Sequence, residues 1–232
     1  GRLYVGALSD QMISAAELGE IDKIKGLLDQ GVPLEARNQD GWTALMKASY
    51  EGHENIVREL IVRGADADAQ ENAGWTPLMM AAQFDYREIV KLLLKGGARI
   101  DIQNRSGATA VIFAALNGHR GVLADLKPSA AVVNMRDNEG KTALIFAAVG
   151  GYDNVAQQLI SFGADVNVKD KQRNTALIIA AKLGHVAVVQ TLFAHCADVR
   201  AMDNQGKTAS KWAVEKQQTK IFQLLVSAPP CN

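Results

Sequence analysis

Hydrophobic side chains recur in a two-part pattern along the chain, which residues 43–64 show most clearly. A first short segment is apolar on one face, with Leu45 and Ala48. A second segment carries a stripe at i, i+1, i+4 and i+5, made by Ile56, Val57, Leu60 and Ile61. Thr43 suits the N-cap of the first helix, and Gly64 suits the left-handed residue that ends the second. The pattern therefore predicts two short helices joined by a turn at residues 52–53.

The same pattern returns at one constant interval, without an insertion. The N-cap threonine recurs at Thr43, Thr76, Thr109, Thr142, Thr175 and Thr208. One helix pair cannot bury its apolar stripe alone, but stacked copies bury it against each other. We therefore predict an all-α solenoid of helix-turn-helix units with extended hairpin turns, forming a single domain over residues 1–232. Its units are 5–37 (the N-terminal cap), 38–70, 71–103, 104–136, 137–169, 170–202 and 203–232 (the C-terminal cap).

The motifs and the interval from Thr43 to Thr76 resemble those of the ankyrin-repeat family. Five segments carry its Gly-x-Thr-x-x start, as in Gly74-Trp75-Thr76-Pro77-Leu78, and the resemblance covers essentially the whole chain. The sequence departs from the family pattern where a His follows Thr-Pro-Leu. The residues at that position are Met46, Met79, Ile112, Ile145, Ile178 and Lys211. We expect apolar packing there in place of the hydrogen bonds of the family's His.

Two irregularities stand out in the repeat. Ala130 and Cys196 occupy the glycine position after the second helix, so both are expected to need a positive φ, at a cost of roughly 1 kcal/mol. Cys196→Gly is therefore expected to stabilise the protein. The fourth unit carries Gly121 and Pro128 in its second helix, and Pro128 should end that helix about a turn early. We predict a soft point at residues 118–132.

Composition and motifs argue against duplex binding, membrane spanning and enzyme activity. The chain has 25 basic and 25 acidic residues, although residues 1–116 carry a net charge of −4 and residues 117–232 one of +4. No overall basic surplus supports duplex binding, and no apolar run approaches the roughly 18–20 residues that span a bilayer. We find no nucleophile elbow, phosphate loop or zinc-protease motif, so we expect no enzyme activity and no cofactor.

The histidines and cysteines do not suggest a site either. His53, His119 and His185 are two units apart, roughly 20 Å, and cannot share a metal ion. We expect these rings, and Tyr86 and Tyr152 at the same turn position, to be structural. The two cysteines are far apart in the sequence, at positions 196 and 231, and are expected to be reduced.

The resemblance implies that partners bind on the concave side, which turn tips and the exposed face of the first helices would form. The candidate partner-binding residues there are Gln39, Asp40, Trp42, Tyr50, Glu51, Asn72, Trp75, Gln83, Phe84, Arg105, Leu116, Asn117, Asn138 and Lys141. Four of the chain's 13 aromatic residues fall on this surface in two adjacent units: Trp42, Tyr50, Trp75 and Phe84. Exposed aromatic residues are typical binding hot spots. The alternative is that both Trp rings only cover the stack.

Basic tips lie beside these aromatic residues and form either a positive edge or a solvated rim: Arg105, Arg136, Lys141, Lys169, Lys171, Arg173 and Lys207. Trp212 is expected to pack within the C-terminal cap. The leading hypothesis is a non-catalytic module that binds another protein. The alternative is a small-ligand or nucleotide sensor, because Trp42 and Trp75 resemble the adenine-stacking position of an oligoadenylate-sensing ankyrin domain.

We expect a monomer, with no metal and no membrane partner, and the neutral charge argues against nucleic acid. Reduced cysteines and the family resemblance favour the cytoplasm, of the source cell or, for an effector, of a host cell. Because residue 1 is Gly and the native start is not visible, a periplasmic or secreted location stays open.

Overall fold

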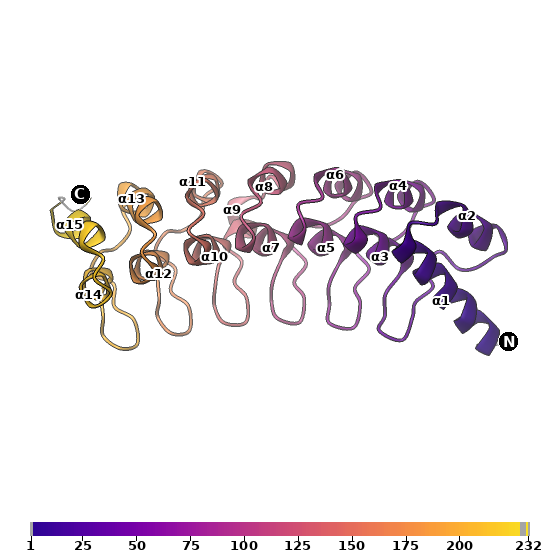
Figure 1. The fold of residues 1–232 in the computed structure, drawn as a ribbon, viewed down its shortest axis with the longest axis horizontal. Coiled ribbons are helices and arrows are strands. Elements are labelled where there is room, and N and C mark those ends of the chain that lie inside the picture. The colour runs from indigo at the N-terminus through magenta and orange to yellow at the C-terminus, as the bar shows by residue number, and fades with distance from the viewer. Residues whose placement is uncertain (1, 228–230, 232) are drawn as a thin grey trace. The chain divides into compact units, whose positions relative to one another are not determined.

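The protein is all-helical over the residues that its computed structural model describes, 2–227 and 231, with side chains described from residue 6 (Figure 1). Neither a strand nor a helix long and apolar enough to cross a membrane occurs in this part of the chain. The helices are α1 (Arg2–Leu18), α2 (Ile21–Asp29), α3 (Ala44–Glu51), α4 (Glu54–Val62), α5 (Pro77–Gln83), α6 (Arg87–Lys95), α7 (Ala110–Leu116), α8 (Arg120–Leu126), α9 (Ala130–Val133), α10 (Ala143–Gly150), α11 (Asp153–Ser161), α12 (Ala176–Leu183), α13 (Val186–Ala194), α14 (Ala209–Glu215) and α15 (Thr219–Ser227). The predicted helix pairs are confirmed.

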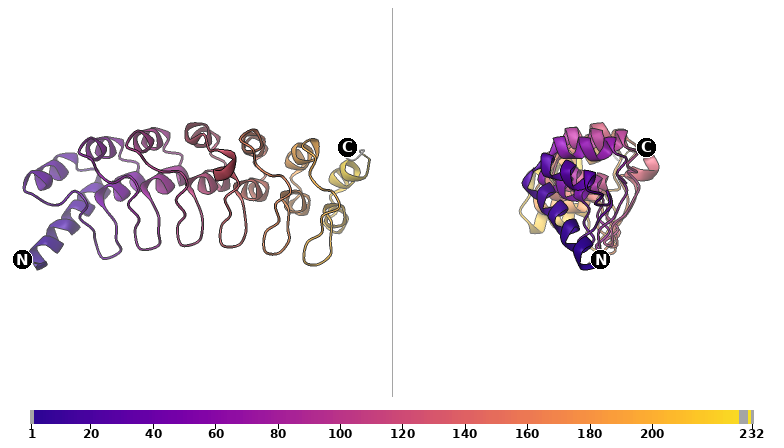
Figure 2. Two further views of the ribbon diagram at one scale, coloured as in Figure 1. Left: turned by 180° about the vertical axis from the view of Figure 1, so that it is seen from behind. Right: turned by 90° about the vertical axis from the view of Figure 1, so that its right-hand side faces the viewer.

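Two compact units make up the chain. Unit 1 comprises Gly1–Ala110 and Ala124–Leu126, and unit 2 comprises Val111–Leu123 and Lys127–Asn232. In unit 1, the first helices α1, α3 and α5 pack in a row, and α4 packs against α6. In unit 2, α10, α12 and α14 form the row of first helices, with α11, α13 and α15 behind them. Within each unit the second helices lie on the side away from the hairpin tips (Figure 2). The assignment of residues 1–232 to one domain stays a prediction.

The N-caps follow the predicted pattern. The hydroxyl of Thr43 accepts a hydrogen bond from the Met46 backbone N–H at 3.3 Å. The same cap forms in other repeats at Thr76, Thr142, Thr175 and Thr208. The expectation of purely apolar packing at the family's His position is wrong for Met46. Its Sδ accepts from the Thr43 N–H at 3.4 Å, because the flexible thioether folds back onto the cap.

Adjacent hairpin tips are joined by backbone hydrogen bonds. In unit 1, Asn72 N donates to the Asp40 carbonyl at 3.0 Å, and Arg105 N donates to the Ala73 carbonyl at 2.9 Å. In unit 2, Lys171 N donates to the Glu139 carbonyl at 3.0 Å. Each bond links one tip to the next at the same place in the repeat. The tips within a unit therefore hold a fixed spacing, which sets the distance between side chains on neighbouring tips.

The fourth repeat departs from the predicted pattern at the end of its second helix. As predicted, α8 stops early, at Leu126, before Pro128. The left-handed residue is Lys127, with φ 45°, and Ala130 instead begins the short helix α9, which Ser129 caps. The predicted positive φ at Ala130 is therefore wrong. Since Pro128 ends the helix early, the reversal moves toward the N-terminus, from position 130 to position 127.

Cys196 adopts the predicted positive φ, 62°, but it is not a free thiol. It forms a disulfide with Cys231, with the two Cα atoms 5.4 Å apart. The expectation of two reduced cysteines is thus wrong. The sequence separation of 35 residues is little more than one repeat, and α15 packs against α13, so the chain after α15 reaches the end of α13.

Candidate functional site

The four predicted aromatic residues gather on one surface of unit 1. We call this surface, made by the turn tips and the exposed side of the first helices, the tip face. Tyr50 packs edge-on against Trp42, with ring centroids 5.6 Å apart and planes at 86°. Tyr50 also packs edge-on against Phe84, at 5.0 Å and 89°. Edge-to-face pairs of this kind stabilise each other and hold the rings in defined orientations.

The two tryptophans combine a structural role with an exposed one. Both are half-buried and pack against a core cluster of Met46, Ala69 and Met80. In contrast, Tyr50 and Phe84 are each 38% exposed, at the C-terminal ends of their first helices. The contacts of the two Trp rings agree with the hypothesis that these rings cover the stack. That hypothesis does not explain why Tyr50 and Phe84 are exposed.

A cavity of about 270 Å³ opens between the tips of the second and third repeats. Its lining residues are Trp42, Tyr50, Glu71, Ala73, Trp75, Met80 and Gln83. Glu71 is fixed in this wall, because its Oε1 accepts from the Ala73 N–H at 2.9 Å and the Trp75 N–H at 2.8 Å. The cavity thus combines aromatic walls with one carboxylate.

Lys47 belongs to this surface, although it was not among the predicted residues. Its Nζ lies 5.2 Å from the Trp42 ring centroid and 5.8 Å from the Tyr50 centroid. The same ammonium pairs with Glu17 and with Glu51, each at 3.4 Å. The available signal was its position four residues after the N-cap, where the first helix faces the aromatic residue at the tip.

The other predicted residues of unit 1 lie around the aromatic group. Gln39, Asp40, Asn72 and Arg105 are exposed, and Gln83 is half-buried. The Asn72 side chain donates to the Gln39 carbonyl at 3.1 Å, which ties the second and third tips together. These polar residues frame the aromatic cluster.

The remaining predicted residues lie in unit 2. Leu116 is 38% exposed, and Asn138 is exposed at its tip. The Asn117 side chain donates to the Phe113 carbonyl at 2.9 Å, which indicates that this side chain stabilises the C-terminal end of α7. Lys141 Nζ lies 5.8 Å from the Phe146 ring centroid.

Trp212 is buried, as predicted for a residue that packs within the cap, with 6% of its surface exposed. Three lysine ammonium groups surround its ring, and this cluster was not predicted from the sequence. The distances from Nζ to the ring centroid are 4.2 Å for Lys182, 4.1 Å for Lys207 and 5.8 Å for Lys216. Aromatic faces attract cations, which explains why lysines from two repeats converge here.

The buried carboxylate of Asp203 supports this ring. Its Oδ2 accepts from Trp212 Nε1 at 2.7 Å, and its Oδ1 accepts from the backbone N–H groups of Gln205 and Lys207. Burial by itself would raise the pKa of the Asp203 carboxyl. The hydrogen bonds from Lys207 N–H, from the Trp212 indole and from Gln205 N–H, with the charge of Lys182, outweigh burial and lower that pKa.

The turn histidines act as predicted where their bonds are described. His53 Nε2 lies 2.8 Å from the Glu17 carbonyl oxygen, and His185 Nε2 lies 3.0 Å from that of Val149. Each ring therefore joins one repeat to the preceding one. Tyr86 and Tyr152 pack at the same position against Gly52 and Gly118. Within residues 2–227 and 231, no three His, Cys, Asp or Glu side chains are grouped as metal ligands.

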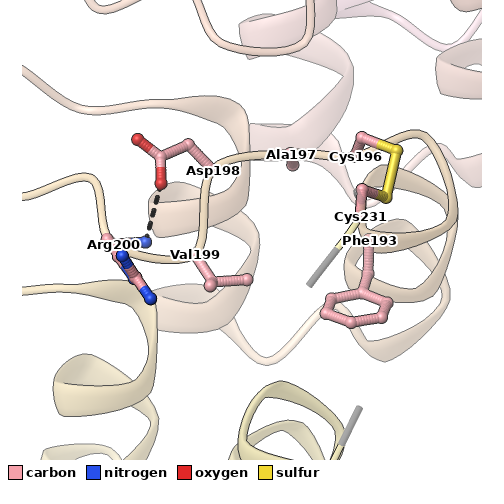
Figure 3. Close-up of a pocket in the computed structure, with 7 residues that line it drawn as sticks. All are labelled: Phe193, Cys196, Ala197, Asp198, Val199, Arg200 and Cys231. Carbon is pink, nitrogen blue, oxygen red and sulfur yellow. Dashed lines mark hydrogen bonds between the residues drawn. A yellow bond between two sulfur atoms is a disulfide. The ribbon is translucent and has the colours of Figure 1, made fainter. Parts of the chain in front are cut away.

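A second cavity, of about 430 Å³, lies beside the disulfide of unit 2. Figure 3 shows the disulfide and Phe193 on one side of the opening, and Asp198 and Arg200 on the other. Arg200 N donates to Asp198 Oδ1 at 2.9 Å and closes the turn after α13. Cys196 cannot act as a nucleophile in this state, because its sulfur is bonded to Cys231.

The repeat geometry agrees with sequence comparison. Residues 12–104, 96–170 and 152–232 each match the family model described as ankyrin repeats (3 copies). The chain belongs to the ankyrin-repeat family. Proteins built from such repeats generally serve as protein–protein interaction modules. We find no curated protein whose sequence matches this chain.

Solved ankyrin structures share the fold. The human ASB11 ankyrin repeat domain is similar with a TM-score of 0.79 and 25% identity, covering 95% of this chain and 99% of that one. The ankyrin repeat protein EF0377 is similar with a TM-score of 0.74 and 28% identity, covering 80% and 97%. The ankyrin repeat domain of Bcl-3, a member of the IkappaB protein family, has a TM-score of 0.79 at 22% identity, covering 92% and 96%, and shows likeness of fold alone.

Proposed function

We propose that this protein is a non-catalytic interaction module that docks a partner protein on the tip face of unit 1. The observation that carries the proposal is the cavity between the second and third tips, beside the exposed rings of Tyr50 and Phe84. Aromatic side chains are enriched among residues that dominate binding energies, especially beside pockets that an anchor residue can fill. Here a partner side chain would enter between Trp42 and Trp75.

The fixed orientation of the rings supports this proposal. Tyr50 is held between Trp42 and Phe84 by two edge-on contacts. A preorganised aromatic surface loses little side-chain entropy when a partner binds, so more of the contact energy remains as affinity. The polar frame of Gln39, Asp40, Asn72 and Arg105, with Glu51 and Gln83, then forms the rim of the interface in unit 1.

Partner capture with matched variants tests the proposal. Wild type, Tyr50→Ser/Phe84→Ser and the control Val62→Ser are used as bait in source lysate, and the captured protein is then purified and titrated. Val62 is 80% exposed on α4, away from the tip face, so its loss controls for reduced surface hydrophobicity. We expect the double variant to weaken binding at least about tenfold and the control less than twofold. Equal binding by all three proteins contradicts the proposal.

Nucleotide stacking on Trp42 and Trp75 is the competing candidate, because both rings line the same cavity. None of the residues that line the cavity is basic, and nearby Lys47 already pairs with two glutamates. A phosphate group therefore meets little positive charge, and we favour the protein partner. Tryptophan fluorescence during titration with adenine nucleotides distinguishes the two candidates. A saturable change that Trp42→Phe abolishes would favour the nucleotide.

We further propose that the protein works as a monomer in an oxidising compartment. The disulfide between Cys196 and Cys231 removes the argument for the cytoplasm that rested on reduced cysteines, since disulfides persist in oxidising surroundings. Thiol alkylation of protein from intact source cells, followed by peptide mass spectrometry, tests the compartment. Light scattering during gel filtration tests the monomer.

A further inference from the structure

The turn tips and first helices of unit 2 form a tip face of their own, which carries a concentration of positive charge around Trp212. The Nζ atoms of Lys182, Lys207 and Lys216 lie 4.2, 4.1 and 5.8 Å from the centroid of this one ring. Two ammonium groups cannot be farther apart than the sum of their distances to that shared centroid. Every pair among the three therefore lies within the Debye length of about 10 Å at 0.1 M salt, so the three ammonium groups repel one another in solution.

Only part of this charge is neutralised within the described residues. Lys207 pairs with Glu215 at 2.7 Å, whereas Lys182 and Lys216 have no carboxylate oxygen of residues 6–227 within 4 Å. The nearby Asp203 does interact electrostatically with Lys182. However, both of its oxygens already accept hydrogen bonds, and only 4% of its surface is exposed. An incoming ligand therefore meets ammonium groups and not this carboxylate.

The neighbouring turn aspartates are occupied in the same way. Asp170 Oδ1 accepts from the backbone N–H groups of Gln172 and Asn174 at 3.0 and 2.8 Å. Asp137 Oδ1 accepts from those of Glu139 and Lys141 at 2.9 and 2.8 Å. Asp137 and Asp170 thus help to build the tips, whereas Glu139 in the first of these turns is exposed. Within the described residues, neither aspartate forms an ion pair with a lysine, so the lysines beside them are not neutralised by these two carboxylates.

Apolar side chains accompany the lysines on the first helices. Leu183 follows Lys182 at the end of α12 and is 49% exposed, and Val149 near the end of α10 is 39% exposed. Helix α12 packs between α10 and α14, so these residues lie on consecutive helices of one row. A ligand that crosses this row would contact apolar groups and ammonium groups together.

We propose that this surface binds an acidic, partly apolar segment of a partner protein. Its carboxylates would pair with Lys182 and Lys216, and an aliphatic side chain would contact Leu183. Charge complementarity selects this occupant, because an anion relieves the repulsion among the three lysines. The surface shares no residue with the aromatic cluster of unit 1, so the proposal stands independently of the function assigned to that cluster.

Fluorescence anisotropy on the whole protein tests the proposal with four labelled probes. They are a 12-residue peptide of four Glu-Glu-Leu triplets, its Gln-Gln-Leu counterpart, a 12-residue Glu peptide and a 12-base single-stranded DNA. We expect saturable binding of the Glu-Glu-Leu peptide, weakened at least about tenfold when salt rises from 0.05 to 0.5 M. We expect no binding of the Gln-Gln-Leu peptide. The other two probes are expected to bind at least about fivefold more weakly than the Glu-Glu-Leu peptide.

Matched variants locate the site. Lys182→Gln/Lys216→Gln is expected to weaken binding about fivefold or more. The control Lys95→Gln/Lys220→Gln removes the same charge from exposed positions on α6 and α15 and is expected to change binding less than twofold. Leu183→Ser should weaken binding about threefold. Circular dichroism melts confirm that each variant is folded, and Lys216→Gln alone, at an exposed position, repeats the test without touching Lys182.

Three results would overturn the proposal. The first is no saturable binding of the Glu-Glu-Leu peptide. The second is equal weakening by the two lysine pairs, which would mean that net charge alone acts. The third is binding of the Glu peptide or the DNA as tight as that of the Glu-Glu-Leu peptide, which would make the surface a general polyanion site. Loss of binding in only the Lys182→Gln/Lys216→Gln and Leu183→Ser proteins supports it.

Discussion

The indole nitrogen of Trp212 donates a hydrogen bond to Oδ2 of Asp203 at 2.7 Å, and both residues are buried. This bond joins α14 to the hairpin tip that precedes it. It belongs to the repeat at residues 203–232, whose helix α14 packs against α12 of the repeat before it. A buried carboxylate that loses a donor retains its desolvation cost, so the bond is important for the stability of the cap.

Trp212→Phe is therefore expected to lower the free energy of unfolding by about 2–4 kcal/mol at neutral pH. Roughly 1.5–3 kcal/mol comes from the lost hydrogen bond to a charged group, and the rest from the smaller ring. Urea unfolding followed by circular dichroism measures the difference. Trp42→Phe is the matched control, since that ring is only half-buried. A Trp212→Phe protein as stable as this control would contradict the prediction.

The same carboxylate predicts a dependence of stability on pH. Its pKa in the folded protein lies below the ordinary value of 3.8, so the folded state favours the ionised form. This contribution is complete above the ordinary pKa and is lost as the pH falls through the lowered folded value. Between about pH 5 and pH 2, stability should fall less steeply in Asp203→Asn than in wild type. Parallel curves for the two proteins would show that Asp203 does not contribute.

The disulfide changes the expected effect of Cys196→Gly. In the oxidised protein this substitution removes a bridge between cysteines with a sequence separation of 35, worth at most about 4 kcal/mol, and relieves about 1 kcal/mol of positive-φ cost. We therefore expect a lower melting temperature than in oxidised wild type. Under reducing conditions the order should reverse, with Cys196→Gly melting above reduced wild type.

Cys231→Ser serves as the control for this experiment. It removes the bridge but keeps Cys196 at its positive φ, so it should melt like reduced wild type under both conditions. If dithiothreitol leaves the melting temperature of wild type unchanged, the disulfide contributes nothing to stability. If Cys196→Gly melts above oxidised wild type, the estimated order of the two effects is wrong.

Arg173 and Lys127 have left-handed conformations. Other repeats place a glycine at the position of Arg173, and among the described residues they have no left-handed residue at the position of Lys127. Arg173 has φ 63° at the position of Gly41, Gly74, Gly107, Gly140 and Gly206 in the other tips. Arg173→Gly and Lys127→Gly should each raise the free energy of unfolding by up to about 1 kcal/mol. Ala130→Gly is the contrasting variant. Ala130 is helical in α9, so the same change should destabilise the protein by up to about 1 kcal/mol.

The fourth repeat is expected to exchange its amide hydrogens faster than its neighbours. Its second helix α8 has 7 residues, against 9 for α6 and α11 in the adjacent repeats, and it contains Gly121. Shorter helices and an interior glycine lower the free energy of local opening. Hydrogen exchange with mass spectrometry should show lower protection over residues 118–132 than over residues 85–97 and 151–163. Equal or higher protection would contradict the soft point.

The sequence by itself determined the repeat, the helix pairs and the positions of the caps. These features follow from local chemistry, such as a threonine hydroxyl that accepts from an N–H three residues later, and this chemistry recurs in register from Thr43 to Thr76 and onward. For the same reason the sequence placed Trp42, Tyr50, Trp75 and Phe84 on one surface. The period assigns each residue its place in the repeat, and residues at equivalent places line up.

Only the tertiary structure decided what depends on contacts between repeats. The disulfide joins residues whose sequence positions carry no pairing signal, and it forms because α15 packs against α13. Likewise, Lys182 comes from one repeat and Lys207 and Lys216 from the next, and they form a cluster because one buried indole attracts all three. Near Pro128 the left-handed residue is Lys127 and not Ala130, because the proline ends the helix before the position that the repeat period predicts.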